Sequence, residues 1–467
     1  MKREDIKDFY NRTAFSREKW ERRNRFYHLS LEKYFSYIIP EQVRVIEIGC
    51  GLGDLLNAVK PCYGVGIDFT PAIIENAAKR YPDLIFHLAD AETFNLNQTF
   101  DYIILSDLAG CLWDAQRVFH NLRKLCHKQT RVVISNFNFL WEPIMNLGEV
   151  LHIKLKQPKQ NWLSTTDLTV LLDLEDFQVV TVQKKILLPK YFPGLNYLIN
   201  GIIANLPLLN TMDLVNLIVA RPLISENAEY SVSIIVPALN EVENIENVIK
   251  RTPSFGFSQE FIFVDGHSTD NTYSEMLRVK EKYSNMTIKV FSQTGKGKGN
   301  AVREGFDAAS GEILMILDSD LTTPPEDLVK FYNVLKQNKG EFINGCRLVY
   351  PMEKDAMRFL NYLANKFFSV FFSYLLGQRL KDTLCGTKVL FKKDYESIKK
   401  NRSYFGDFDP FGDFDLLFGA AKQNLKMTEI MVRYREREYG STRIKRFKHG
   451  WLLVKMSFFA ARKMKFI

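Results

Sequence analysis

Short apolar runs alternate with helical stretches through both halves of this 467-residue chain. This alternation is the pattern of parallel α/β sheets, in which each strand is followed by a helix. It predicts an α/β protein with two doubly wound domains. The predicted strands are residues 43–48, 64–68, 84–88, 102–106 and 131–136 in the first half, and 232–237, 260–265, 288–292, 313–317 and 341–345 in the second.

A stretch of polar residues without periodicity, Ala220–Ser231, lies between the two halves. The chain length is that of two to three domains, because a single hydrophobic core stops growing well below it. We therefore place a domain boundary near residue 225. The expected organisation is a first domain over 1–222, a linker over 223–230, a second domain over 231–445 and a basic amphipathic segment over 446–467.

Composition and charge narrow the class of protein. The six cysteines are scattered and form no CxxC pair, which favours reduced thiols in a cytoplasmic protein over disulfides or a zinc site. The N-terminal residues lack the apolar core of a signal peptide, and no uncharged apolar run reaches the ~18 residues that span a bilayer. Residues 433–467 hold eleven Lys or Arg and two Glu, a surplus equal to the whole net charge of +9.

The first predicted strand leads directly into the sequence EIGCGLGD, Glu47–Asp54. Its three glycines let the backbone turn tightly and let a ligand lie against the main chain. The helix that follows directs its N-terminal amides into the same space. A dinucleotide-binding turn would have a third glycine in the G-x-G-x-x-G pattern, but Asp54 occupies that position, which disfavours NAD.

The next two predicted strands each end close to an acid. Asp68 is placed to accept hydrogen bonds from two ribose hydroxyls, and Asp90 to receive an exocyclic amine. This order and spacing resembles the class I S-adenosylmethionine-dependent methyltransferases over about residues 30–140. The resemblance implies S-adenosylmethionine as cofactor, held through Glu47, Gly49, Gly51 and Gly53 at the methionine part, Asp68 at the ribose, and Asp90 with Ala91 at the adenine.

The methyl acceptor is not specified by this motif. The family has no universal catalytic residue, because the sulfonium is already activated and the enzyme mostly supplies proximity. We expect residues 141–217 to shape the acceptor pocket. Their apolar sequence YLINGIIANLPLLN is typical either of an apolar pocket wall or of an ordinary pair of core helices.

In the second half, the apolar run Ile313–Leu317 continues directly into Asp318 and Asp320. Two carboxylates this close raise each other's pKa unless a positive charge lies between them. One interpretation is a strand that ends at the surface and caps the next turn. The other is a divalent cation that bridges the carboxylates to a phosphate.

Polar residues also follow the neighbouring predicted strands, with Glu241 after the first and Asp265 and Asp270 after the second. A glycine and lysine loop that contains Lys296 comes next. Ligands of parallel sheets bind outside the carboxyl ends of the strands, where all these residues fall. Acids for a base and ribose, with a metal for a pyrophosphate, fit a nucleotide diphosphate whose developing charge the metal stabilises.

These motifs resemble the family 2 glycosyltransferases of the GT-A fold, in particular dolichyl-phosphate mannose synthase and other polyprenyl-phosphate sugar synthases, from about residue 230 to 445. Asp265 is followed by Gly266 where the family commonly has a second acid, so the choice between a UDP- and a GDP-sugar stays open. The resemblance implies these contacts to the nucleotide sugar: Pro237, Ala238, Glu241, Asp265, Asp270, Lys296 and Asp318.

The resemblance also implies roles at the reacting centre. Asp318 and Asp320 would bind Mg²⁺ or Mn²⁺, and Asp320 and Asp413 would be the catalytic residues. Asp413 would act as a general base, and the other interpretation is that it caps the following helix. A phosphate acceptor is already ionised and has little need of a general base. The implied contacts to the acceptor phosphate are Arg347, Arg437 and Arg443, although the arginines of this region also fit a solvated basic face.

Together, these motifs predict a bifunctional enzyme. It would transfer a sugar with inversion to a polyprenyl phosphate and methylate an unknown acceptor. Two alternatives stay open: a glycosyltransferase whose front domain binds S-adenosylmethionine without turnover, and a non-enzymatic nucleotide-binding scaffold at the membrane. We expect no nucleic-acid partner.

The basic residues near the C-terminal end indicate a position at a membrane surface. Residues 443–467 interleave Lys and Arg with Trp, Phe and Leu, which is typical of a helix in the headgroup plane of an anionic membrane. The sequence favours that position over packing against a core. The segment Ala356–Gly377 fits either position. We therefore expect a cytoplasmic protein peripherally associated with the inner face of the membrane.

Overall fold

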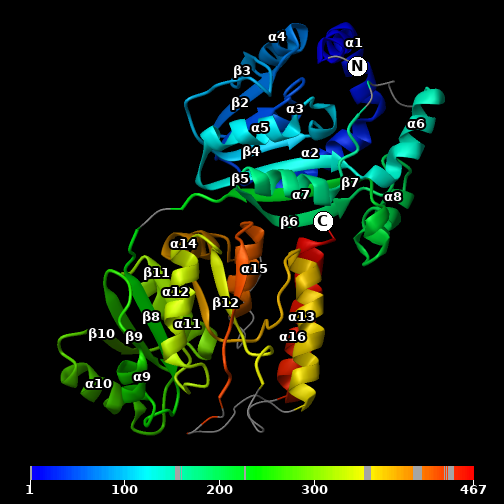
Figure 1. Ribbon diagram of the computed structural model, residues 1–467. Helices are drawn as coiled ribbons and strands as arrows, with labels where there is room; N and C mark the ends of the chain where they lie inside the picture. The colour runs from blue at the N-terminus through cyan, green and yellow to red at the C-terminus, as the bar shows by residue number, and fades with distance from the viewer. Residues whose placement is uncertain are drawn as a thin grey trace. The chain divides into compact units, whose positions relative to one another are not determined.

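The computed structural model describes residues 3–152, 158, 160–225, 228–351, 359–402, 413–435, 437, 439 and 446–466. Its contacts divide the chain into two compact units, and the boundary between them in the sequence lies between Ile224 and Ser225. Each unit has its own seven-stranded sheet with helices packed on it (Figure 1). The predicted α/β class is confirmed.

The sheet of the first unit has the strand order β3-β2-β1-β4-β5-β7-β6. The five strands from β3 to β5 run parallel, whereas β7 is antiparallel to both of its neighbours. Its main elements are α1 (Arg3–Arg23), α2 (Arg25–Ile38), β1 (Arg44–Ile48), α3 (Asp54–Ala58), β2 (Tyr63–Asp68), α4 (Pro71–Arg80), β3 (Ile85–Leu88), β4 (Phe100–Ser106), α5 (Ala115–Leu122), β5 (Cys126–Phe137), α6 (Glu142–Val150), α7 (Thr165–Leu174), β6 (Phe177–Lys185), α8 (Leu195–Ile199), η4 (Ile203–Asn205), η5 (Leu209–Met212) and β7 (Val215–Pro222).

The sheet of the second unit has the order β10-β9-β8-β11-β13-β12-β14, with β13 antiparallel to both of its neighbours. Its main elements are β8 (Val232–Ala238), α9 (Ile245–Arg251), β9 (Gln259–Asp265), α10 (Thr272–Lys282), β10 (Thr287–Ser292), α11 (Lys298–Ala308), β11 (Ile313–Ile316), α12 (Leu328–Lys336), β12 (Phe342–Cys346), α13 (Phe359–Leu376), β13 (Lys388–Phe391), α14 (Lys392–Lys400), α15 (Asp413–Lys422), β14 (Met427–Met431) and α16 (Arg446–Met464).

All ten predicted strands are present, with ends that shift by a few residues. The central strands are apolar throughout because both faces of each sheet are covered. In β11, for example, Leu314 and Ile316 belong to the core on one face and Ile313 and Met315 to the core on the other. The strands that the sequence did not predict are β6, β7, β13 and β14. The stretch assigned to a polar linker from Ala220 begins inside β7, which is buried to Pro222.

The strand order creates one reversal in each sheet. In the first unit the chain starts at β1, moves outward through β2 to β3, and returns to β4 on the other side of β1. In the second unit β8, β9, β10 and β11 repeat this path. Connections leave the two central strands toward opposite edges, which opens a crevice outside their carboxyl ends. The predicted site residues come from the ends of these strands.

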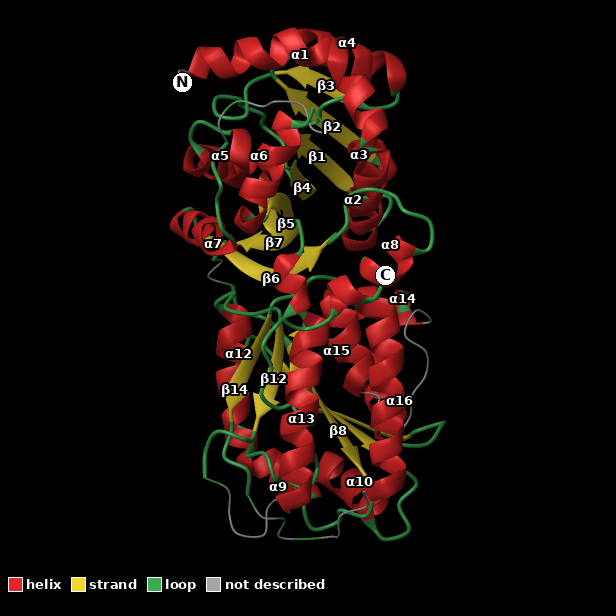
Figure 2. Ribbon diagram, turned by 90° about the vertical axis from the view of Figure 1, so that its right-hand side faces the viewer, coloured by secondary structure: helices red, strands yellow, loops and turns green. Residues whose placement is uncertain are grey.

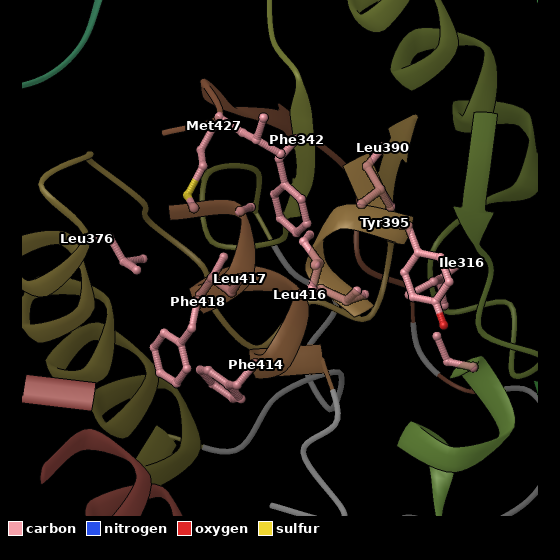
Figure 3. Close-up of a cluster of buried hydrophobic side chains, with 14 of the residues drawn as sticks. Ile316, Phe342, Leu376, Leu390, Tyr395, Phe414, Leu416, Leu417, Phe418 and Met427 are labelled. Carbon is pink, nitrogen blue, oxygen red and sulfur yellow. The ribbon is translucent and has the colours of Figure 1, made fainter. Parts of the chain in front are cut away.

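The larger core of the second unit lies between its sheet and the helices α13, α15 and α16 (Figure 3). Phe414 and Phe418 of α15 pack on Phe372 of α13, with ring centroids 5.1 and 5.6 Å apart. Aromatic contacts at this spacing contribute beyond the area that they bury.

Helix α16 packs beside α13, as Figures 1 and 2 both show, and Met456 and Ala460 belong to this core. The expectation that the C-terminal segment does not pack against a core is therefore wrong. The other side of the helix pair exposes large apolar side chains, among them Trp451 and Phe458 of α16 and Phe367 of α13. Within the described residues, no helix is both long and apolar enough to cross a membrane.

We predict that Met456→Ala lowers the free energy of unfolding by about 2–5 kcal/mol, because it leaves a cavity in a packed core. Phe458→Ala is the matched control on the same helix, since Phe458 is 76% exposed, and it should change stability by less than about 0.5 kcal/mol. Urea unfolding followed by circular dichroism measures both. Equal losses for the two variants would contradict the packing of α16.

Candidate functional site

The turn between β1 and α3 requires glycine at two positions. Gly49 and Gly53 have φ angles of +74° and +82°, which side-chain-bearing residues rarely adopt. A Cβ atom at Gly49 would lie 2.9 Å from the Leu108 side chain, and one at Gly53 would lie 2.8 Å from Phe86. Both positions therefore bring the backbone close to its neighbours, and Gly51 between them also has a positive φ.

Asp68 ends β2 beside this turn. Its buried carboxylate accepts hydrogen bonds from the Gly51 amide at 3.2 Å and from the Thr70 amide at 2.9 Å. Asp90, after β3, accepts from the Glu92 amide at 3.0 Å and pairs with Lys7 of α1 at 2.6 Å. The structure thus holds each of these carboxylates through neighbouring donors.

The glycine turn and these acids line one large cavity of about 1030 Å³ inside the first unit. Its inner wall includes Glu47, Asp68, Asp90 and Ala91. Other parts of the wall come from α1, α2 and α6, and the α6 part includes the apolar Ile144 and Leu147. The volume matches the upper end of small-molecule pockets, about 300–1,000 Å³. Of the first-half residues that the sequence singled out, Gly49 also lines this cavity, whereas Gly51 and Gly53 belong to the same turn but are not part of the wall.

Asp107 is a cavity residue that the sequence reasoning missed. It follows β4 with a left-handed φ of +53°, and its carboxylate accepts from the Tyr27 hydroxyl at 2.6 Å and the Ser135 hydroxyl at 2.7 Å. Burial and the nearby Asp107 charge raise the pKa of Tyr27. The signal was available, because Asp107 follows a predicted strand by one residue.

In the second unit the two carboxylates after β11 are held by different cations. Lys298, the first residue of α11, pairs with Asp318 at 2.5 Å. Burial would raise the pKa of Asp318, but the charge and hydrogen bond of Lys298, together with the charges of Lys388 and Arg347, lower it. A Cβ atom at Gly386 would overlap both charged groups, so the loop before β13 passes directly against this pair. Lys296, the lysine chosen from the sequence, is exposed.

Arg437 joins two site residues that are far apart in the sequence. Its guanidinium pairs with Asp320 and lies 3.5 Å from a carboxylate oxygen of Glu241. The Thr322 amide and hydroxyl donate to the other oxygen of Asp320 at 3.2 and 2.8 Å. Lys298 and Arg437 are thus the cations that let the two aspartates stand one residue apart.

The acids after β9 are engaged by their own turns. Asp265 accepts from the His267 amide at 3.1 Å and the Ser268 amide at 3.2 Å. Asp270 accepts from the Thr272 amide at 2.9 Å. The Ala238 carbonyl, next to Pro237 at the end of β8, accepts from the Gly266 amide at 2.7 Å. These contacts shape the floor of the crevice.

Arg347 makes a bidentate ion pair with Asp382, with distances of 2.7 and 2.9 Å. Asp382 is fully buried and also accepts from the Asn365 amide at 3.0 Å. Burial would raise the pKa of Asp382, but the Arg347 charge and these hydrogen bonds lower it to about 2. The sequence predicted Arg347 but not its partner.

Two other predicted residues are described less fully. Arg443 lies outside the described residues. Asp413 begins α15, but the structure describes its backbone alone. Its neighbour Asp415, which the resemblance aligns with a family glutamate, pairs with Arg303 at 3.1 Å.

No group of three or more His, Cys, Asp or Glu side chains within the described ranges is arranged to hold a metal ion. Asp318 and Asp320 therefore offer two carboxylates and no third side-chain ligand of these types. Mg²⁺ commonly binds through one or two carboxylates and completes its shell with phosphate oxygens and water. The residues present fit a divalent cation that arrives with a phosphate-bearing ligand.

Comparison with protein families agrees with this geometry. Residues 39–184 match the family described as methyltransferase domain, and residues 233–398 match glycosyl transferase family 2. The first match contains the cavity acids up to Asp107, and the second contains the crevice from β8 to β13. Residues of the first unit therefore match a methyltransferase domain, and residues of the second unit match a family 2 glycosyltransferase.

Two curated relatives are similar to the second unit. Glycosyltransferase AglJ of Haloferax volcanii is 29% identical over 212 residues, which are 45% of this chain and 65% of that protein. The dolichol-phosphate mannosyltransferase of Pyrococcus furiosus is 31% identical over 175 residues, 36% of this chain and 49% of that protein. The chain thus spans about half to two thirds of the length of these relatives.

Among solved structures, the chain is similar to a SAM-dependent methyltransferase of Thermotoga maritima, titled a possible histamine N-methyltransferase. The sequence identity is 18% and the TM-score 0.37, over 46% of this chain and 99% of that one.

We predict that Asp382→Asn lowers the free energy of unfolding at pH 7 by about 3–5 kcal/mol, because it leaves the Arg347 charge buried without its partner. The pKa of Asp382 is lower in the folded chain than its value of about 4 in the unfolded chain, so the ionised carboxylate stabilises the fold at pH values above about 4. That contribution is lost as the pH falls toward 2, so the gap between wild type and variant should narrow over this window.

Urea titrations at several pH values measure this gap. The control is Glu326→Gln, which breaks the half-exposed pair with Arg251 and should change stability by less than about 1 kcal/mol. A gap of the same size at every pH would contradict the assigned ion pair.

Proposed function

We propose that the second unit transfers a sugar, with inversion, from a UDP- or GDP-sugar to a polyprenyl phosphate. The observation that carries this proposal is the cluster of Glu241, Asp318, Asp320, Lys298 and Arg437 outside the central strands of the sheet. The name of the Pyrococcus furiosus relative, a dolichol-phosphate mannosyltransferase, supports a lipid phosphate as the acceptor class.

The cations of this cluster suit a ligand with several phosphates. Lys298 stands at the N-terminus of α11, where backbone amides add to its positive field. Arg437 offers a planar fork of donors that matches phosphate oxygens. Both cations pair with aspartates, and a bound diphosphate would take over part of these contacts. Neither cation then loses its counter-charge.

Asp318 and Asp320 would hold a Mg²⁺ or Mn²⁺ ion together with the diphosphate. When bound, the ion would stabilise the charge that develops on the diphosphate of the leaving UDP or GDP. We assign Arg347 a positioning role, because its bidentate contact with Asp382 anchors the loop that carries Gly386 against Asp318. Arg437 is the described arginine that we assign to the phosphates of donor and acceptor.

We propose that the first unit binds S-adenosylmethionine and transfers its methyl group to a separate acceptor. The left-handed turns of Gly49 and Gly53 and the carboxylates of Asp68 and Asp90 support the cofactor. The cavity volume of about 1030 Å³ is at the upper end for small-molecule pockets, which supports space for an acceptor beside the cofactor. Asp107 is the cavity carboxylate that we assign to the acceptor side, held by Tyr27 and Ser135.

We further propose a peripheral position on the cytoplasmic face of a membrane for the second unit. The exposed apolar side of α13 and α16, with Phe367, Trp451 and Phe458, supports this position. Lys455 on the same helix adds positive charge, which is favourable near anionic lipids. A polyprenyl acceptor keeps its tail in the lipid, so an enzyme at the surface meets its phosphate.

We predict that Asp320→Asn lowers sugar transfer by about a hundredfold or more, because a lost metal carboxylate costs several kcal/mol and each 1.4 kcal/mol is a factor of ten. Binding of S-adenosylhomocysteine should not change, since its site lies in the other unit. The assays are transfer of labelled sugar to polyprenyl phosphate and calorimetry with UDP and GDP, each with and without Mn²⁺.

The control for this variant is Asp327→Asn, because Asp327 pairs with the neighbouring Lys330 and stands apart from the cluster. Sugar transfer by the Asp320 variant at the wild-type rate would refute the metal site. A chelator that leaves transfer by the wild-type chain unchanged would refute it as well.

We predict that Asp68→Ala weakens S-adenosylhomocysteine binding about tenfold or more, because the ribose loses two hydrogen bonds. The same substitution frees the Gly51 and Thr70 amides, so Asp68→Asn, which keeps one acceptor oxygen, should weaken binding less. Asp101→Asn is the control, since Asp101 lies on β4 and not on the cavity wall. Calorimetry that finds one affinity for all four proteins would refute the cofactor site.

A further inference from the structure

The first unit exposes large apolar side chains on two segments, residues 139–151 and 191–212, which we call the apolar face. The segments include α6 and α8. Figures 1 and 2 both place these helices on one side of the unit, the side that turns toward the viewer in Figure 2. Val150, Tyr197 and Leu208 are 72%, 78% and 82% exposed. Exposed apolar side chains that gather on one side of a soluble protein often mark a binding site.

Helix α6 shows that this exposure is not incidental. It has the sequence EPIMNLGEV and contains no buried residue. Ile144 and Leu147 line the cavity and are 54% and 57% exposed. The helix therefore lies at the mouth of the cavity, and its apolar side chains continue from the cavity wall to the outer surface.

Positive charge lies beside part of the apolar face, whereas residues 139–151 of the face carry Glu142 and Glu149. In residues 22–31, at the junction of α1 and α2, Arg23 and Arg25 are exposed, while Arg22 pairs with Glu18. In residues 177–212, Lys184 and Lys190 are half-buried and Lys185 is buried. The two stretches touch, because Lys190 donates to the Asn24 side chain at 2.6 Å and the ring of Tyr191 lies 5.7 Å from that of Phe26. Burial and the nearby Arg23 charge lower the pKa of Lys190.

We propose that the apolar face docks on an anionic phospholipid bilayer, with the cavity mouth open to the lipid. Exposed Leu, Ile, Tyr and Phe beside a basic rim are typical of a surface that enters the headgroup region. A second copy of the chain would bring the same positive rim against this one, which disfavours self-association. The docking is separate from that of α13 and α16, because its residues belong to the other unit.

This position has a consequence for the methyl acceptor, which rests on the proposed methyl transfer. An acceptor that reaches the cavity through α6 comes from the lipid phase. Its class is a membrane-borne molecule whose polar part enters the cavity, rather than a dissolved metabolite. The lipid tail would stay against Ile144 and Leu147.

A local probe tests the docking independently of activity. In the full chain with Cys62→Ser and Cys111→Ser, which remove the exposed and half-buried thiols, a single cysteine is placed by Tyr197→Cys or by Leu208→Cys and labelled with a polarity-sensitive dye. The control label is placed by Val170→Cys on α7, where the side chain is also exposed. Circular dichroism checks that each labelled chain is folded.

We expect the emission at positions 197 and 208 to rise and shift to shorter wavelength with vesicles of phosphatidylcholine and phosphatidylglycerol. The change should be weaker with phosphatidylcholine alone, and position 170 should show none. Unchanged emission at 197 and 208 while the chain floats with the vesicles would overturn the proposal and leave the docking of α13 and α16 intact. A blue-shifted label before any lipid is added would also overturn it, since the chain itself would then cover the face.

Discussion

In both units two neighbouring parallel strands end without a covering connection, because the chain leaves them toward opposite edges of the sheet. β1 and β4 form this pair in the first unit, and β8 and β11 form it in the second. Residues at the ends of these strands are brought together from positions far apart in the sequence. Both proposed ligand sites depend on this reversal of strand order.

Each crevice gathers carboxylates that would repel one another without donors or cations. In the first unit, backbone amides hold Asp68, and hydroxyls from Tyr27 and Ser135 hold Asp107. In the second unit, Lys298 and Arg437 hold Asp318 and Asp320. The difference in partners fits the difference in ligand. The carboxylates of the first unit, with Lys7 beside Asp90, suit the hydroxyls and amine of the proposed cofactor, whereas the cations of the second suit the proposed diphosphate with a divalent metal.

The sequence predicted what short-range patterns encode. The ten predicted strands and the acids at their ends follow from the apolar runs, since each buried parallel strand is apolar throughout. The strands β6, β7, β13 and β14 were missed, because they carry no ligand motif. The end of β7, from Ala220, was read as part of the polar stretch between the two halves.

The sequence does not show which charged residues, far apart along the chain, form ion pairs with each other. Nothing local to Arg347 identifies Asp382, and nothing local to Lys298 shows that this lysine, rather than Lys296, reaches Asp318. The core packing of α16 was missed because its basic residues dominate the pattern, whereas Met456 and Ala460 face the core at helical spacing.

We propose above all that this chain makes a lipid-linked sugar. Mass spectrometry of lipid extracts from cells with and without the gene tests it most directly. The account predicts that one polyprenyl-phosphate sugar is lost without the gene and restored when the chain is supplied again. Identical profiles of lipid-linked sugars in the two extracts would contradict it.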